Sequence, residues 1–265
     1  MVHFMQRTGL RLRLVTLAPL VVVILGAADA ARDPASLIKV SHLDGALYVV
    51  EDSFWLKENS VFYVGNSNVT LVGAGWSPSA AKQIEAGIKK ITDKPITEVI
   101  DTDFNPDRAG GNAYWKQRGA KVVAIEQTAK LLKEDWGGYW SATRKNIPDL
   151  PKTDDSLPTT TYPGDFALQD GNVKAFYLGP THMPDDIFVN FPNERVLYAG
   201  NILKEQPGNL ASADLGAYMK SLAKLKALHL DIDTIISGHW SPVHGPELID
   251  IYISFLKQAA AQPKP

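Results

Sequence analysis

The stretch "VIDTDFNPDRAGGNAYW", residues 99–115, holds the residues with the clearest chemical potential. After an apolar run, short polar side chains occupy alternate positions at Asp103, Asn105 and Asp107, and a Gly-Gly pair follows. Carboxylates placed in this way can bind a metal ion or take a proton from water. The loop contains no histidine. Any nitrogen ligands of a metal site must therefore come from elsewhere in the chain.

Three more polar residues follow other expected strands: His182 in "GPTHMPDD", Asn201 in "YAGNILKE" and His239 in "ISGHWSPVHG". Loops at strand ends commonly carry binding groups. A hydrolytic zinc site needs about three protein ligands and an open position for water. Two histidines and two carboxylates could supply them. The same residues could instead cap helices or hydrogen-bond to loop backbone, and both interpretations stay open from the residues alone.

The hydrophobic pattern predicts strands followed by helices, twice over, with a Pro- and Thr-rich loop at 148–163 between the halves. This order favours two β-sheets packed face to face with helices outside, a four-layer αβ/βα sandwich in the α/β class. The expected strands lie at 46–54, 60–67, 69–76, 96–101, 120–125, 165–171, 173–179, 187–192, 195–200 and 233–238, and the expected helices at 78–91, 110–119, 126–145, 213–228 and 245–258.

The first thirty residues have the layout of a secretory signal peptide. Three arginines precede the apolar run "LVTLAPLVVVILG", and "ADA" supplies small residues before Ala31. We therefore expect residues 1–30 to be removed and 31–265 to form one soluble periplasmic domain, without a membrane anchor after cleavage.

Composition excludes several other classes of protein. The chain has 27 Lys and Arg against 29 Asp and Glu, a balance that gives no field to gather nucleic acid. It has no cysteine, so a thiolate metal site, a cysteine nucleophile and a disulfide framework are all excluded.

Over about residues 37–256, the chain resembles the metallo-β-lactamases, specifically their mono-zinc, carbapenem-selective subclass. The similarity rests on Asp107 and Arg108 in the loop, and on "AGGNAYW", "GNILKE" and "GHWSPVHGPELID". It implies a single metallo-β-lactamase-fold domain that binds one zinc ion, acts as a monomer and confers resistance to β-lactam antibiotics. Residue by residue, the resemblance places the zinc ligands at Asp107, Asn201 and His239, the neighbouring metal position at Asp103, Asn105 and His182, the contact to the substrate carboxylate at Lys204, and the contact to the β-lactam carbonyl at Asn209.

Two positions depart from the family pattern. Asn201 replaces a cysteine thiolate and Asn105 replaces a histidine, whereas Asp103 adds a carboxylate. Without sulfur, the remaining ligands would also suit manganese or iron. We expect a hydrolase in which a metal-bound water opens the β-lactam amide, with Asp107 or Asp103 taking the proton. The alternatives are a catalytically impaired relative that binds metal weakly and acts as a binding protein, or a hydrolase of another ester or phosphoester.

Overall fold

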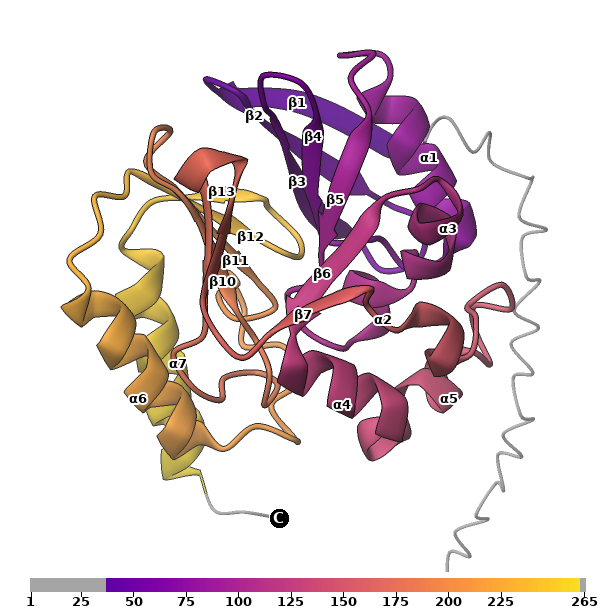
Figure 1. The fold of residues 1–265 in the computed structure, drawn as a ribbon. Helices are drawn as coiled ribbons and strands as arrows, with labels where there is room; N and C mark the ends of the chain where they lie inside the picture. Colours follow the sequence, from indigo (N-terminus) through magenta and orange to yellow (C-terminus); the bar gives the residue numbers. More distant parts are fainter. Residues whose placement is uncertain (1–36, 263–265) are drawn as a thin grey trace, which may run out of the picture. The chain divides into compact units, whose positions relative to one another are not determined.

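The computed structural model describes residues 37–262. Two mixed β-sheets face each other with helices on their outer sides (Figure 1). The first sheet has β1 to β7 in sequence order, antiparallel from β1 to β4 and parallel from β4 to β7. Its strands are β1 (Ile38–Asp44), β2 (Leu47–Asp52), β3 (Glu58–Val64), β4 (Val69–Val72), β5 (Ile96–Ile100), β6 (Lys121–Ile125) and β7 (Thr160–Tyr162).

The second sheet has the order β13-β12-β11-β10-β9-β8, and only β11 and β12 run parallel. Its strands are β8 (Phe166–Leu168), β9 (Val173–Phe176), β10 (Phe188–Phe191), β11 (Val196–Gly200), β12 (Thr234–Ser237) and β13 (Val243–His244). The helices are α1 (Pro78–Ile88), α2 (Pro106–Ala109), α3 (Asn112–Gln117), α4 (Glu126–Glu134), α5 (Tyr139–Thr143), α6 (Leu215–Ala227) and α7 (Leu248–Ala261).

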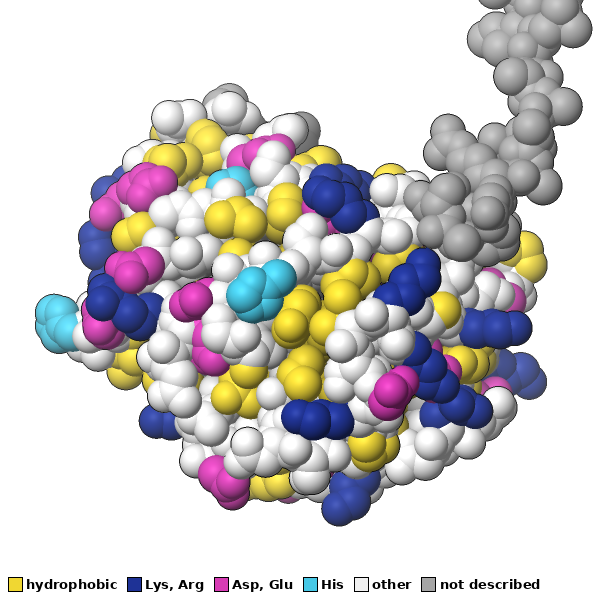
Figure 2. Space-filling model, turned by 90° about the horizontal axis from the view of Figure 1, so that it is seen from above, with side chains coloured by type: hydrophobic (Ala, Val, Ile, Leu, Met, Phe, Trp, Pro, Cys, Tyr) yellow, Lys and Arg dark blue, Asp and Glu magenta, His cyan; other side chains and the backbone are white. Residues whose placement is uncertain are grey.

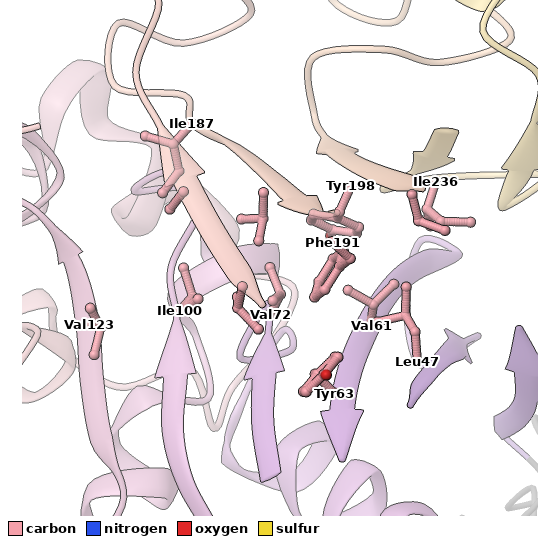
Figure 3. Close-up of a cluster of buried hydrophobic side chains, with 14 of the residues drawn as sticks. Leu47, Val61, Tyr63, Val72, Ile100, Val123, Ile187, Phe191, Tyr198 and Ile236 are labelled. Atoms are coloured by element: carbon pink, nitrogen blue, oxygen red, sulfur yellow. The ribbon is translucent and has the colours of Figure 1, made fainter. Parts of the chain in front are cut away.

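The main core lies between the two sheets. Alternate strand residues point inward, so that Val61 and Val72 of the first sheet face Phe191 and Tyr198 of the second (Figure 3). On the outer side of the first sheet α1 and α3 bury Ala81, Ile84 and Trp115, and on that of the second α6 and α7 bury Leu222 and Tyr252. The four-layer sandwich predicted from the sequence is confirmed.

Several local predictions differ from the structure. The helix expected over 126–145 is broken into α4 and α5, because Asp135, Gly137 and Gly138 all have positive φ. Strands β1, β7 and β13 were not predicted. Strand β7 lies inside the segment 148–163 that the sequence indicated as a loop.

No helix within residues 37–262 is long and apolar enough to cross a membrane. The predicted signal peptide lies outside the described residues. On the face seen in Figure 2, acidic and basic side chains are interspersed, as the near-balanced composition predicts.

Candidate functional site

The polar loop predicted from the sequence leaves the end of β5 and enters α2, which begins at Pro106. Close backbone packing holds this loop in place. A Cβ atom on Gly110 would lie 2.1 Å from the carbonyl oxygen of Trp76, and one on Gly111 would lie 2.1 Å from that of Ala74. Only glycine therefore allows the Gly-Gly pair to approach the segment that follows β4.

The guanidinium of Arg108 is the centre of the site. Its side chain is fully buried. Nη1 donates to the hydroxyl of Tyr198 at 2.7 Å and to the carbonyl of Asn59 at 3.0 Å, and lies 3.2 Å from a carboxylate oxygen of Glu58. Nη2 contacts the Asp107 carboxylate at 3.0 Å and donates to the carbonyl of Gly238 at 2.8 Å. Arg108 thus ties the loop after β5 to β3, to β11 and to the end of β12.

Asn201 at the end of β11 bridges two carboxylates. Its Nδ2 group donates to Asp103 at 3.2 Å and to Asp107 at 3.1 Å, while its Oδ1 accepts from Arg108 Nη2 at 3.3 Å. Rotating the amide by 180° would point its oxygen at two carboxylates and its N–H groups at a guanidinium. The surrounding charges therefore fix the orientation of the amide.

His239 follows β12 and completes the cluster. Its Nδ1 lies 2.8 Å from the carbonyl oxygen of Lys57, which can only accept, so Nδ1 carries a proton. Its Nε2 faces Asp107 Oδ2 at 3.1 Å. Arg108 Nη2 lies 3.5 Å from the same nitrogen, so that one guanidinium nitrogen contacts both partners of this pair.

Burial and these charges separate the pKa values of the two carboxylates. Burial raises the pKa of Asp103 well above its usual range, and the negative charges of Asp186 and Asp107 add to the shift. Burial also acts to raise the pKa of Asp107, but the adjacent Arg108 guanidinium and His239 hold it below its usual range. Burial and these charges thus shift the pKa values of Asp103 and Asp107 in opposite directions.

A cleft of about 520 Å³ opens above this cluster. Asn105, Asp107, His182, Asn201, Lys204, Asn209 and His239 line it, together with the apolar side chains Trp55, Leu56, Trp76, Tyr139, Met183 and Trp240. Trp76 and Tyr139 line the cleft and also pack against the buried cluster that contains Trp140.

Two nitrogen-bearing side chains in the cleft have unusual environments. Lys204 is only 3 % exposed, and among residues 37–262 no carboxylate forms an ion pair with it. Burial lowers the pKa of Lys204 to about 8 and that of His182 to about 3, so the lysine is largely cationic and the histidine neutral at pH 7. The Nδ1 atom of His182 is buried and has no hydrogen-bond partner in the described chain.

The donor groups do not fit a zinc centre with three protein ligands. Within residues 37–262, no three His, Cys, Asp or Glu side chains are placed to hold one metal ion. Asp107 and His239 converge, but Asn201 turns its N–H groups toward the carboxylates and gives its oxygen to Arg108. Asp103 is fully buried and does not line the cleft.

The structure thus brings Asp103, Asp107, Asn201 and His239 together, and places His182 and Lys204 in the cleft beside them. Asn209 lies exposed at its rim. Glu58, Asn59 and Tyr198 could not be predicted as partners of Arg108, because they are strand residues distant in the chain.

Comparison with known proteins identifies the family. Residues 54–239 match the model of the metallo-beta-lactamase superfamily. A metallo-beta-lactamase type 2 from Bacillus sp. (strain 170) is 29% identical over 180 residues, which cover 66% of this chain and 63% of the relative, slightly less than two thirds of its length. The type 2 enzyme of Bacteroides fragilis is 27% identical over 228 residues, 80% of this chain and 83% of the relative.

Solved structures show the same fold. VMB-1 has a TM-score of 0.73 at 20% identity, and TMB-1 has 0.71 at 17%; both matches cover 84% of this chain and 98% of the other. Together with the family match over most of the described residues, these similarities lead to one conclusion: the chain belongs to the metallo-β-lactamase superfamily.

Proposed function

We propose that this protein is a periplasmic, monomeric hydrolase that binds carboxylate-bearing β-lactams, with carbapenems favoured, and opens their amide slowly. One observation carries the proposal: the ammonium of Lys204 stands without an ionic partner from residues 37–262 in an apolar-walled cleft, beside an ionised Asp107. A buried cation of this kind is suited to a ligand carboxylate.

The walls of the cleft support the binding of a small rigid ring. Trp55, Trp76 and Trp240 offer flat apolar surfaces, and Gly208 leaves space for the lysine, since a Cβ there would lie 3.1 Å from Lys204 Nζ. At the rim, Asn209 Oδ1 accepts from the backbone of Ala211 at 3.0 Å. This bond leaves the Asn209 amide N–H groups available to the carbonyl oxygen of a substrate.

In the proposed reaction, the oxygen of a water molecule attacks the amide carbonyl carbon while Asp107 accepts its proton. The C–N bond then breaks, and the nitrogen takes a proton from solvent. Neutral His182 forms a hydrogen bond with this water. Asp103 does not contact the substrate; it accepts hydrogen bonds from Asn201 and from the backbone of Asn105 and so positions both residues. A carboxylate with a depressed pKa is a weak base, so we expect slow turnover.

A second function, binding without hydrolysis, is favoured by the same hydrogen-bonded cluster. The Asp107 oxygen that faces His239 already has contacts with Arg108 and Asn201. In such a protein the ligand would occupy the cleft unchanged.

One experiment separates these functions. Purified protein is mixed with nitrocefin or imipenem at comparable concentrations, and both ring opening and Tm are measured. Ring opening faster than in buffer supports the hydrolase. A rise in Tm with an intact ring supports the binding protein, and neither response to either compound would rule out both.

The periplasmic location is part of the proposal and rests on the signal-peptide pattern at residues 1–30. Mass spectrometry of the protein from a periplasmic extract should give an N-terminus at Ala31. Recovery of the intact N-terminus in the cytoplasm would contradict this location.

A further inference from the structure

A single nitrogen atom of Arg108 contacts all three side chains that the family resemblance assigns to zinc. Nη2 lies 3.0 Å from the carboxylate of Asp107, 3.3 Å from the amide oxygen of Asn201 and 3.5 Å from Nε2 of His239. The Asp107 carboxylate and the Asn201 amide oxygen are acceptors, and Nε2 of His239 accepts or donates according to its protonation. Acceptors that converge in a buried site repel one another unless positive charge lies among them.

Arg108 supplies that charge from a rigid position. Its side chain is fully buried, and its other terminal nitrogen is held by Tyr198, Asn59 and Glu58. The planar guanidinium cannot turn toward solvent without breaking these contacts to strands β3 and β11.

Asn201 provides further hydrogen-bond donors to the carboxylates, in addition to the Arg108 guanidinium. Its N–H groups bind Asp103 and Asp107, which would otherwise face each other unshielded. A thiolate at this position would add negative charge and could not donate these hydrogen bonds. A carboxylate at this position would likewise repel both aspartates.

We propose that Arg108 and Asn201 together replace the metal ion in this protein, so that the loop after β5 and the ends of β11 and β12 keep their geometry without any bound metal. The amide at position 201 is the element that makes the cluster independent of metal. This inference concerns how the site is held together and does not depend on which ligand the cleft takes.

The test measures metal content and Tm rather than turnover. Wild-type protein is dialysed against a chelator, analysed for metal, and melted with the chelator or with added zinc. We expect well below stoichiometric zinc and a difference in Tm of less than about 1 °C between the two conditions. Stoichiometric zinc after dialysis, or stabilisation by zinc of several degrees, would overturn the proposal.

Two variants test the role of the amide. In Asn201→Cys and Asn201→Asp the two hydrogen bonds are lost and a metal-binding group is gained. We expect both to melt lower than wild type in chelator and to gain about 4 °C or more with zinc. Asn146→Asp makes the same charge change at an exposed position and should not respond to zinc.

The variants also allow the proposal to fail in a second way. If neither position-201 variant gains a zinc response although wild type has none, the amide is not what replaces the metal. If a variant does not fold, its recovery in folded form only when zinc is present during refolding supports the proposal, whereas failure to fold with zinc as well counts against it.

Discussion

At the scale of single residues, Asn201 departs most from what the family resemblance implies. The family resemblance placed Asn201 among the zinc ligands, whereas the residues alone left a hydrogen-bonding role open; in the structure Asn201 donates to two carboxylates. Its role depends on which acceptors and cations surround it, and these come from residues 103–108, about a hundred positions away. No local pattern encodes that neighbourhood, although the pattern did identify both partners as site residues.

Replacing Lys204 should lower the affinity for a carboxylate-bearing ligand. In Lys204→Ala the substrate carboxylate loses a charge-assisted hydrogen bond in a buried site, so we expect roughly 10- to 100-fold weaker binding of imipenem. Lys220→Ala removes a lysine on the exposed side of α6 and should leave binding unchanged. Isothermal titration measures both, and equal effects of the two variants would contradict the assignment of Lys204.

The protonation of Lys204 predicts how binding depends on pH. Burial lowers the pKa of Lys204 to about 8 in the free protein, and an anionic ligand needs the protonated form. Affinity should therefore be constant at neutral pH and fall by about tenfold for each pH unit above 8. Titrations between pH 7 and 9.5 test this, and a constant affinity across that range would argue against a lysine anchor.

At the scale of secondary-structure elements, the alternating strands and the helical faces were readable because burial imposes a period of two or of about 3.6 residues. Short edge strands escaped prediction, since β7 and β13 have too few residues for any period to show. The break between α4 and α5 could have been predicted from Gly137-Gly138, but the amphipathic pattern continued across it. The loop that enters α2 was located correctly because the apolar run at 96–100 marked the strand that precedes it.

The close packing of Gly110 against the backbone of Trp76 predicts that an added side chain at position 110 lowers stability. In Gly110→Ala the new methyl group would meet the carbonyl oxygen of Trp76 at 2.1 Å, and neither backbone segment can move freely. We expect a loss of about 3 kcal/mol or more in the free energy of unfolding. Gly164→Ala, where no atom lies within 4 Å of the added carbon, should be near neutral. Urea unfolding measures both, and similar stability of the two variants would refute the packing argument.

The end of β2 carries a buried carboxylate whose pKa predicts a dependence of stability on pH. Burial raises the pKa of Asp52 to about 6, although Asp52 accepts a 2.7 Å hydrogen bond from the backbone of Phe54. The folded state thus holds this proton more tightly than the unfolded state, and stability falls as pH rises from about 4 to about 6.

Removing that charge should therefore stabilise the protein above pH 6. Asp52→Asn keeps an acceptor for Phe54 and should gain about 1–2 kcal/mol at pH 7.5, with no gain at pH 4. Asp44→Asn is the matched control, because Asp44 is exposed and also accepts from a neighbouring backbone N–H. An equal gain in both variants, or a gain in Asp52→Asn that does not change with pH, would contradict the assigned cause.

At the scale of the whole molecule, the sandwich brings the ends of β5, β11 and β12 to one place, where Arg108 joins them. The sequence indicated these strand ends as a candidate site, because each polar residue in the cluster followed a recognisable strand and folds of this type gather loops at strand ends. The sequence could not predict that Asp107, Asn201 and His239 would already be paired with one another and with Arg108. These contacts depend on side-chain directions that the packing of both sheets determines.

The proposed function requires that the cleft hydrolyse carboxylate-bearing β-lactams with its own residues and with Lys204 as the anchor. The most direct test follows the absorbance of imipenem with excess enzyme in the presence of a chelator, for wild type and for Lys204→Ala. We predict ring opening by wild type that is slow but clearly faster than in buffer, and at least about tenfold slower in Lys204→Ala. Decay at the buffer rate with wild type, or an unchanged rate in Lys204→Ala, would contradict this function.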